Sequence, residues 1–195
     1  MLTNLLINHN TVIDSNGPGA ASCATFNESN VNEFAPTLTM TNNICFEGMY
    51  GIGANINGSF TQGTAGLNQM MSSGSYTITK NVSIGTPQAT WPAGNFQPTT
   101  AAAVDFTNFN SGNGGNYQLT SSSPYYKAGT DGLDIGVSNW SCLNSLIALA
   151  TNGTYTEAGA SCANSSTSTP TAPPRAGLLL ARGQFGFLLG MEWLF

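Results

Sequence analysis

Charged residues are scarce in this sequence. Lysine, arginine, aspartate and glutamate make up 7% of its 195 residues, whereas an ordinary soluble domain contains about 25%. Hydrophobic residues account for 41%, which separates the chain from disordered acidic segments, because those are poor in hydrophobic residues. Asn, Ser, Thr and Gly must supply the solubility instead. This composition favours a β-rich extracellular protein over a cytosolic enzyme.

Basic residues are especially few. There are four, Lys80, Lys127, Arg175 and Arg182, and the formal net charge is −5. A surface that binds nucleic acid needs clustered lysine and arginine to neutralise phosphates. Nucleic acid is therefore excluded as a partner. The single histidine, His9, has no accompanying metal-binding motif, so the sequence predicts no metal site and no cofactor.

Three short segments repeat one pattern of alternating apolar residues around an asparagine. They are residues 5–13, 38–46 and 76–84, which align on Asn10, Asn43 and Asn81. Apolar residues lie five before, three before and three after each asparagine: Leu5, Ile7 and Ile13, then Leu38, Met40 and Phe46, then Tyr76, Ile78 and Ile84. Such alternation is the signature of a strand with one buried face, and copies at intervals of about 20 to 50 residues are typical of a solenoid. The pattern predicts stacked β-coils joined by long surface loops.

The repeated asparagine has a physical role in this prediction. Asparagine tolerates the left-handed backbone conformation of a tight corner, and its side-chain amide can bond to the equivalent amide above and below. A buried amide without a partner would cost about 1–3 kcal/mol. Asn10, Asn43 and Asn81 are therefore expected to form a structural ladder that fixes the register of the strands.

Two polar columns beside this ladder are candidate carbohydrate contacts. His9, Asn42 and Lys80 lie one residue before each ladder asparagine, and Asp14 and Glu47 lie four after the first two. Equivalent positions on neighbouring strands lie about 5 Å apart, so the columns could hold a sugar chain, with Trp91 or Tyr50 as a platform. The alternative is an ordinary solvated corner.

The cysteines suggest an oxidising compartment. Cys23, Cys45, Cys142 and Cys162 include no Cys-x-x-Cys arrangement, so two disulfides are expected. A Cys142–Cys162 bond would close a surface excursion, and a Cys23–Cys45 bond would tie a loop to a coil. The sequence cannot choose among the three pairings, and free buried thiols are the alternative.

The ends of the chain differ from its middle. Coils and a closing motif are expected over residues 1–140, a loop region, with or without a disulfide, over 141–164, a Ser/Thr/Pro linker over 165–175, and an apolar, irregular tail over 176–195. No membrane association is expected, except through that tail. No signal peptide precedes Leu5, and an uncapped first coil would expose apolar surface. The chain is therefore expected to be a truncated stack, the C-terminal part of a longer exported protein.

The segment Tyr117 to Gly136 adds a family resemblance. Its "Tyr-x-Leu…Ser-Pro…Ala-Gly…Asp-Gly…Asp-Ile-Gly" pattern resembles the closing motif of secreted bacterial right-handed parallel β-helix proteins, the pectin-lyase-like group. The likeness covers residues 4–140 and implies an all-β, right-handed parallel β-helix (solenoid). From the residues themselves, Tyr117 and Leu119 alternate as a last inward strand, and Asp131 and Asp134 are expected to accept bonds from nearby backbone amides in a turn.

The resemblance implies an extracellular or cell-surface protein that binds or processes polysaccharide. Members of the group include polysaccharide lyases and glycoside hydrolases, whose sites use acidic calcium clusters, Lys/Arg bases or several aspartates. None of these constellations is visible in this sequence, so no catalytic residue is assigned, and a catalytic site would lie upstream or be absent. Whether the protein is an enzyme stays open. The alternative is a non-enzymatic structural or adhesin-like protein.

Overall fold

The computed structural model describes residues 4–13, 22–28, 37–71 and 75–154. They belong to two compact units that divide between Ser138 and Asn139. The strands are β1 (Leu5–Asn8), β2 (Ala24–Glu28), β3 (Leu38–Thr41), β4 (Ile44–Phe46), β5 (Ile52–Ile56), β6 (Ser59–Gln62), β7 (Tyr76–Thr79), β8 (Val82–Ile84), β9 (Phe106–Asn108) and β10 (Asn116–Leu119). The helices are α1 (Gly63–Met70), α2 (Trp140–Thr151) and two short 3₁₀ helices, η2 (Ala101–Val104) and η3 (Asn110–Gly112).

Two of the four sheets in the first unit are wholly parallel. One has the order β1-β3-β7 and the other pairs β4 with β8. The register places Leu5 beside Leu38 and Leu38 beside Tyr76. Ile7, Met40 and Ile78 are aligned in the same way. These are the apolar columns of the sequence alignment, and they hold one face of the sheet against the core.

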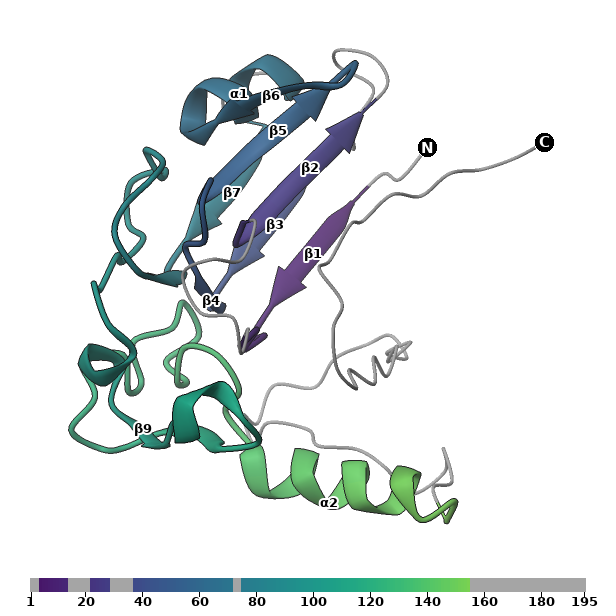
Figure 1. The fold of residues 1–195 in the computed structure, drawn as a ribbon, viewed down its shortest axis with the longest axis vertical. Coiled ribbons are helices and arrows are strands. Elements are labelled where there is room, and N and C mark those ends of the chain that lie inside the picture. Colours follow the sequence, from purple (N-terminus) through teal and green to yellow (C-terminus); the bar gives the residue numbers. More distant parts are fainter. Residues whose placement is uncertain (1–3, 14–21, 29–36, 72–74, 155–195) are drawn as a thin grey trace. The chain divides into compact units, whose positions relative to one another are not determined.

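The third sheet contains a hairpin that the sequence pattern did not indicate. In the order β2-β5-β6, β2 and β5 are parallel whereas β5 and β6 are antiparallel. Asn57 and Gly58 turn this hairpin with positive φ angles of 52° and 77°, as a two-residue hairpin loop requires. Helix α1 follows directly and packs on β5 and β6 (Figure 1). Its Gly66 allows this close approach, because a Cβ atom there would lie 2.0 Å from the Thr61 carbonyl oxygen.

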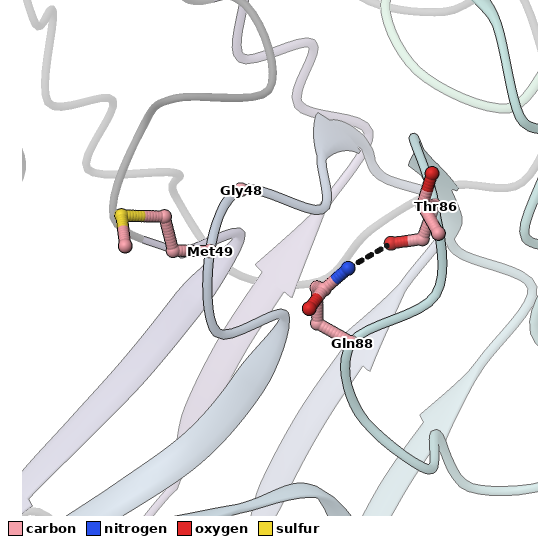
Figure 2. Close-up of a pocket in the computed structure, with 4 residues that line it drawn as sticks. All are labelled: Gly48, Met49, Thr86 and Gln88. Atoms are coloured by element: carbon pink, nitrogen blue, oxygen red, sulfur yellow. Dashed lines mark hydrogen bonds between the residues drawn. The ribbon is translucent and has the colours of Figure 1, made fainter.

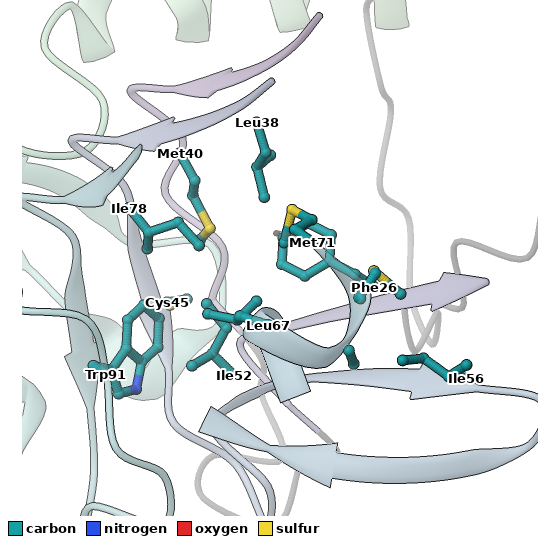
Figure 3. Close-up of a cluster of buried hydrophobic side chains, with 12 residues drawn as sticks. Phe26, Leu38, Met40, Cys45, Ile52, Ile56, Leu67, Met71, Ile78 and Trp91 are labelled. Atoms are coloured by element: carbon teal, nitrogen blue, oxygen red, sulfur yellow. The ribbon is translucent and has the colours of Figure 1, made fainter. Parts of the chain in front are cut away.

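The main hydrophobic core lies between these elements. Figure 3 shows side chains from β2, β3, β5, β7 and α1 pointing toward one another. Leu67 and Met70 of α1 are fully buried there, as is Ile52 of β5. Burial of such side chains is the main source of stability in a domain of this size. Residues 52–71 lie between the second and third repeated segments, where long surface loops were expected, and they supply part of the core instead.

The fourth sheet pairs β9 with β10 in antiparallel orientation. Tyr117 and Leu119 of β10 are both buried, so the strand predicted over these residues forms. The Phe106 ring stacks on Phe109 with centroids 5.9 Å apart, and Tyr117 meets Phe106 edge to face at 5.9 Å. This aromatic cluster holds the pair together, since edge-to-face and offset rings attract.

The predicted fold class is wrong. The described residues form a mixed α/β fold with two α-helices and four small sheets, three of which contain parallel strands, and they include no solenoid or closed sheet. The expectation of an all-β, right-handed parallel β-helix failed because residues 52–71 form a hairpin and a helix. The antiparallel pairings β5–β6 and β9–β10 are likewise foreign to a stack of parallel coils.

The second unit, as far as it is described, consists of helix α2 and the residues that follow it. Asn139 caps the helix, with its side-chain oxygen accepting a bond from the Cys142 amide at 3.3 Å. A helix therefore begins where the sequence predicted a loop region. No helix among the described residues is long and apolar enough to cross a membrane. The predicted linker over 165–175 and apolar tail over 176–195 lie outside the described residues.

Candidate functional site

The predicted ladder asparagines are joined side chain to side chain. The backbone amide and Nδ2 of Asn10 both donate to Oδ1 of Asn43, at 2.9 Å each. Asn43 repeats this pattern toward Asn81, with distances of 3.1 and 2.8 Å. Asn81 and Asn43 are buried. Each carbonyl oxygen thus accepts two bonds from the preceding asparagine, and this fixes the register of β1, β3 and β7.

A fourth asparagine, Asn95, completes this row, and "asparagine ladder" below means Asn10, Asn43, Asn81 and Asn95. Asn81 donates from its backbone amide and from Nδ2 to Oδ1 of Asn95, at 2.9 Å each. The next residue, Phe96, forms a parallel bridge with Val82. The repeated sequence pattern does not include Asn95, because no alternating apolar residues flank it. The one sequence feature that could have identified Asn95 is the residue before it, since Gly94 precedes Asn95 as Lys80 precedes Asn81.

The left-handed corners lie one residue earlier than predicted. His9, Asn42 and Lys80 have φ angles of 53°, 58° and 57°. Asn10, Asn43 and Asn81, which follow them, do not have positive φ angles. The reason is local: Asn10, Asn43 and Asn81 each donate from Nδ2 to the carbonyl oxygen two residues before them, as Asn43 does to Thr41 at 2.8 Å. That closed turn forces the intervening residue into the left-handed region.

The segment 129–137 covers part of the first candidate carbohydrate column. His9 Nε2 lies 2.7 Å from an Asp131 carboxyl oxygen, and Nδ1 lies 3.0 Å from the Gly136 carbonyl oxygen. Asn42 is 1% exposed; its Oδ1 accepts the Thr130 amide at 2.8 Å. Their polar atoms are thus committed to the chain's own backbone and side chains.

The third member of that column has a different environment. The Lys80 ammonium nitrogen lies 5.3 Å from the centre of the Phe96 ring, a distance typical of a cation–π contact. The structure therefore brings His9, Asn42 and Lys80 into equivalent corners without giving them a common accessible surface. Asp14, from the second column, lies outside the described residues.

Glu47, the other member of the second column, is a buried hub. It is 1% exposed, and its Oε1 accepts the Gln88 and Ala89 amides at 3.0 and 3.2 Å. Its Oε2 accepts the Trp91 indole N–H at 2.9 Å and the Ser83 hydroxyl. Bonds from several donors offset the cost of burying a carboxyl group. The sequence pattern does not reveal this role, because the donors are 36 to 44 residues away from Glu47.

The two aromatic residues proposed as a sugar platform differ in accessibility. Trp91 is 8% exposed, and its ring packs into the main core (Figure 3). Tyr50 is 43% exposed, and its ring meets Phe60 edge to face at 5.4 Å. Only Tyr50 of this pair presents a surface to a ligand.

A shallow pocket lies beside Gly48, the residue that follows Glu47. Gly48, Met49, Thr86 and Gln88 line it, and its volume is about 270 Å³ (Figure 2). Gln88 Nε2 donates to the Thr86 carbonyl oxygen at 3.1 Å. Both walls are held by Glu47, since Gly48 follows it and the Gln88 amide bonds to it. The residues that line the pocket are uncharged, and contacts with Glu47 fix the position of the backbone that carries them.

Asp105, Asp131 and Asp134 also accept bonds from the backbone or from nearby hydroxyl groups. Asp134 accepts the Lys127 amide at 3.0 Å, and Asp131 accepts the Leu133 amide at 3.1 Å, which confirms the predicted turn bonds. Partial burial alone would raise the pKa of Asp131, but bonds from His9 and Leu133 outweigh it and hold that pKa below its ordinary value. Asp105 accepts the Thr120 and Ser122 hydroxyls, and these bonds lower its pKa.

Cysteine chemistry is structural in the described residues. Cys23 and Cys45 form a disulfide that joins the start of β2 to β4. Cys142 is also disulfide-bonded, whereas Cys162 lies outside the described residues. No group of three or more His, Cys, Asp or Glu side chains that could hold a metal ion occurs where the structure describes the chain.

Comparison with protein-family models, with curated proteins and with solved structures finds no match to the chain.

Proposed function

We propose that the chain belongs to a non-catalytic extracellular protein with a structural or adhesive role. The observation that carries this proposal is that the acidic side chains in the described part of the chain are committed to hydrogen bonds within it. Glu47, Asp105, Asp131 and Asp134 each accept intramolecular hydrogen bonds that hold a turn or a loop. A general acid or base must instead be free to reach a substrate proton. These acidic groups therefore stabilise the fold.

The disulfide Cys23–Cys45 supports the extracellular part of the proposal, because disulfides persist in oxidising compartments. The low content of charged residues, 7%, agrees with it. Asparagine, serine and threonine provide a polar but neutral surface that is insensitive to salt. Such a surface suits a protein that works outside the cell.

A turnover assay tests the non-catalytic role. The purified chain is incubated with acidic and neutral polysaccharides, and new reducing ends and unsaturated uronates are measured. We expect no product above a heat-denatured control. Turnover that is lost in Asp131→Asn or Glu47→Gln, with the circular dichroism spectrum retained, would overturn the proposal.

A second candidate function is non-catalytic binding of a neutral glycan at the Gly48–Gln88 pocket. The neutral lining and the exposed Tyr50 next to Met49 favour it. Amide and hydroxyl groups beside an aromatic ring match the donors and the apolar faces of a sugar. This site replaces the columns predicted from sequence, because Asn42 and Glu47 are buried.

Calorimetric titration with neutral oligosaccharides tests this binding. We expect Gln88→Ala to weaken affinity about tenfold, the loss that one good hydrogen bond accounts for. Gln69→Ala is the matched control, since Gln69 is an exposed amide on α1. Equal loss in both variants, or no binding by the wild type, would remove the pocket from consideration.

A further inference from the structure

Backbone groups along the outer edge of β1 have no partner strand among the described residues. The Leu5 and His9 amides donate to the Thr37 and Thr41 carbonyl oxygens of the β3 side, at 3.0 and 3.4 Å. Successive residues in a strand alternate the direction of their backbone groups, so Leu6 and Asn8 direct their N–H and C=O groups away from β3. Among the described residues, no strand pairs with that edge.

The asparagine ladder is incomplete at the same edge. Asn43 donates from Nδ2 to the Ile7 carbonyl oxygen of the preceding strand at 3.0 Å, and Asn81 does the same to Met40 at 2.8 Å. Oδ1 of each accepts two bonds from the preceding asparagine. Within the described part of the chain, Asn10 has neither kind of contact, and its Nδ2 bonds to Asn8 and Asn43. The missing contacts define what the next strand must offer.

The apolar side chains of β1 are also less covered than their equivalents. Leu38 and Met40 are 1% and 4% exposed, whereas Leu5 and Ile7 in the same columns are partly buried. On the opposite face Leu6 is 67% exposed. A strand added beside β1 would bury these groups, and a flat apolar edge strand invites such pairing.

A second copy of the chain does not offer a matching strand end. At the far end of the ladder, Asn95 repeats the internal contact, with its Nδ2 donating to the Ile78 carbonyl oxygen of the preceding strand at 2.8 Å. The neighbouring Phe96 ring packs against Tyr125, with centroids 5.3 Å apart. Because the chain's own residues cover that end, a copy cannot continue the ladder head to tail.

We propose that the edge of β1 binds an extended segment of a partner protein, aligned parallel to β1, with an asparagine in register with Asn10. The partner's asparagine donates from its backbone N–H and Nδ2 to Oδ1 of Asn10, while Asn10 Nδ2 donates to a carbonyl oxygen three residues before it. Apolar residues five and three positions before that asparagine continue the Leu5 and Ile7 columns. The pairing continues the β3–β1 and β7–β3 contacts already present. The site is separate from the pocket and from the proposed function.

A peptide titration tests this site on the full chain. The probe is a synthetic peptide with the sequence of residues 38–46 and a Cys45→Ser change, and its control carries Asn43→Ala as well. We expect the probe to bind at least tenfold more tightly than the control, because the control leaves the amide contacts unmade. Equal binding of both peptides, or binding of neither, would overturn the proposal.

Two variants of the protein locate the binding. Leu6→Pro removes an N–H that points away from β3, and proline is tolerated on an edge strand; we expect binding to be abolished. Leu6→Thr keeps this N–H and is expected to bind within about threefold of the wild type. Unchanged binding in Leu6→Pro would place the peptide elsewhere. Self-association of the free chain that Leu6→Pro abolishes would make a second copy the occupant and would also overturn the proposal.

Discussion

The asparagine ladder and the Glu47 hub bury polar groups in opposite ways. A ladder amide both donates and accepts, so each asparagine can make the same hydrogen bond to the next one. A carboxyl group that only accepts gathers its donors from one place, here Ser83 and the loop 88–91. The amide therefore allows a row to be extended, whereas the carboxyl group fixes a single loop. This difference explains why the asparagine ladder ends at an open strand edge, whereas the Glu47 carboxyl group is enclosed by its own donors.

The largest expected effect is the loss of the hub. Glu47→Leu leaves the Gln88 and Ala89 amides and the Trp91 indole N–H without their acceptor. Each buried donor left unpaired costs about 1–3 kcal/mol, so we expect the free energy of unfolding to fall by roughly 3–5 kcal/mol. Urea denaturation followed by tryptophan fluorescence measures it.

Glu47→Gln is the matched control for that change. The amide keeps the shape and one acceptor, but its NH₂ group faces other donors. A loss of about half that of Glu47→Leu is expected. If the contacts of Glu47 do not stabilise the protein, both variants will have the free energy of unfolding of the wild type.

A smaller effect is expected along the ladder, with a gradient from inside to edge. Asn81→Ala removes contacts to Asn43, Asn95 and the Met40 carbonyl oxygen, and we expect it to cost about 2–3 kcal/mol. Asn10→Ala, at the exposed end, is expected to cost less than about 1 kcal/mol, since water replaces its contacts. Thermal unfolding of both variants checks the gradient, and equal costs would contradict it.

The smallest expected effect concerns the cover over His9. The pKa of Asp131 is lowered in the folded protein, so its contribution to stability is complete above the unfolded pKa and is lost as the pH falls through the folded value. Asp131→Asn should therefore lower stability slightly at neutral pH and flatten its decline in acid. Unfolding midpoints measured from neutral pH down through the carboxyl range test this. If stability declines in acid as steeply in Asp131→Asn as in the wild type, Asp131 is not the source of that decline.

The sequence allowed the ladder side of this comparison to be predicted, but not the hub or the fold class. The ladder repeats a short local pattern, so the columns of Leu5, Ile7 and their equivalents could be aligned without coordinates. Glu47 has no local signature, because its partners come from a distant loop. Helix α1 was missed because Gly63 and Gly66 are poor helix formers; its packing on β5 and β6 overrides that propensity.

The candidate site shows the same limit. His9 and Asn42 occupy equivalent corners directly after β1 and β3, but a segment more than 80 residues further along covers them. Sequence spacing predicts which residues share an edge, and only tertiary structure reveals what lies over that edge. Asn95 was lost for a related reason, since no strand pattern precedes it.

The central claim is that the ladder amides are bonded inside the sheet and open at Asn10. Hydrogen exchange of the asparagine side-chain amides, followed by ¹⁵N NMR, tests it most directly. We predict slow exchange for the Nδ2 groups of Asn43 and Asn81 and fast exchange for Asn10, slowed when the residue 38–46 peptide is added. Fast exchange at Asn81, or equal rates at all three asparagines, would contradict the account.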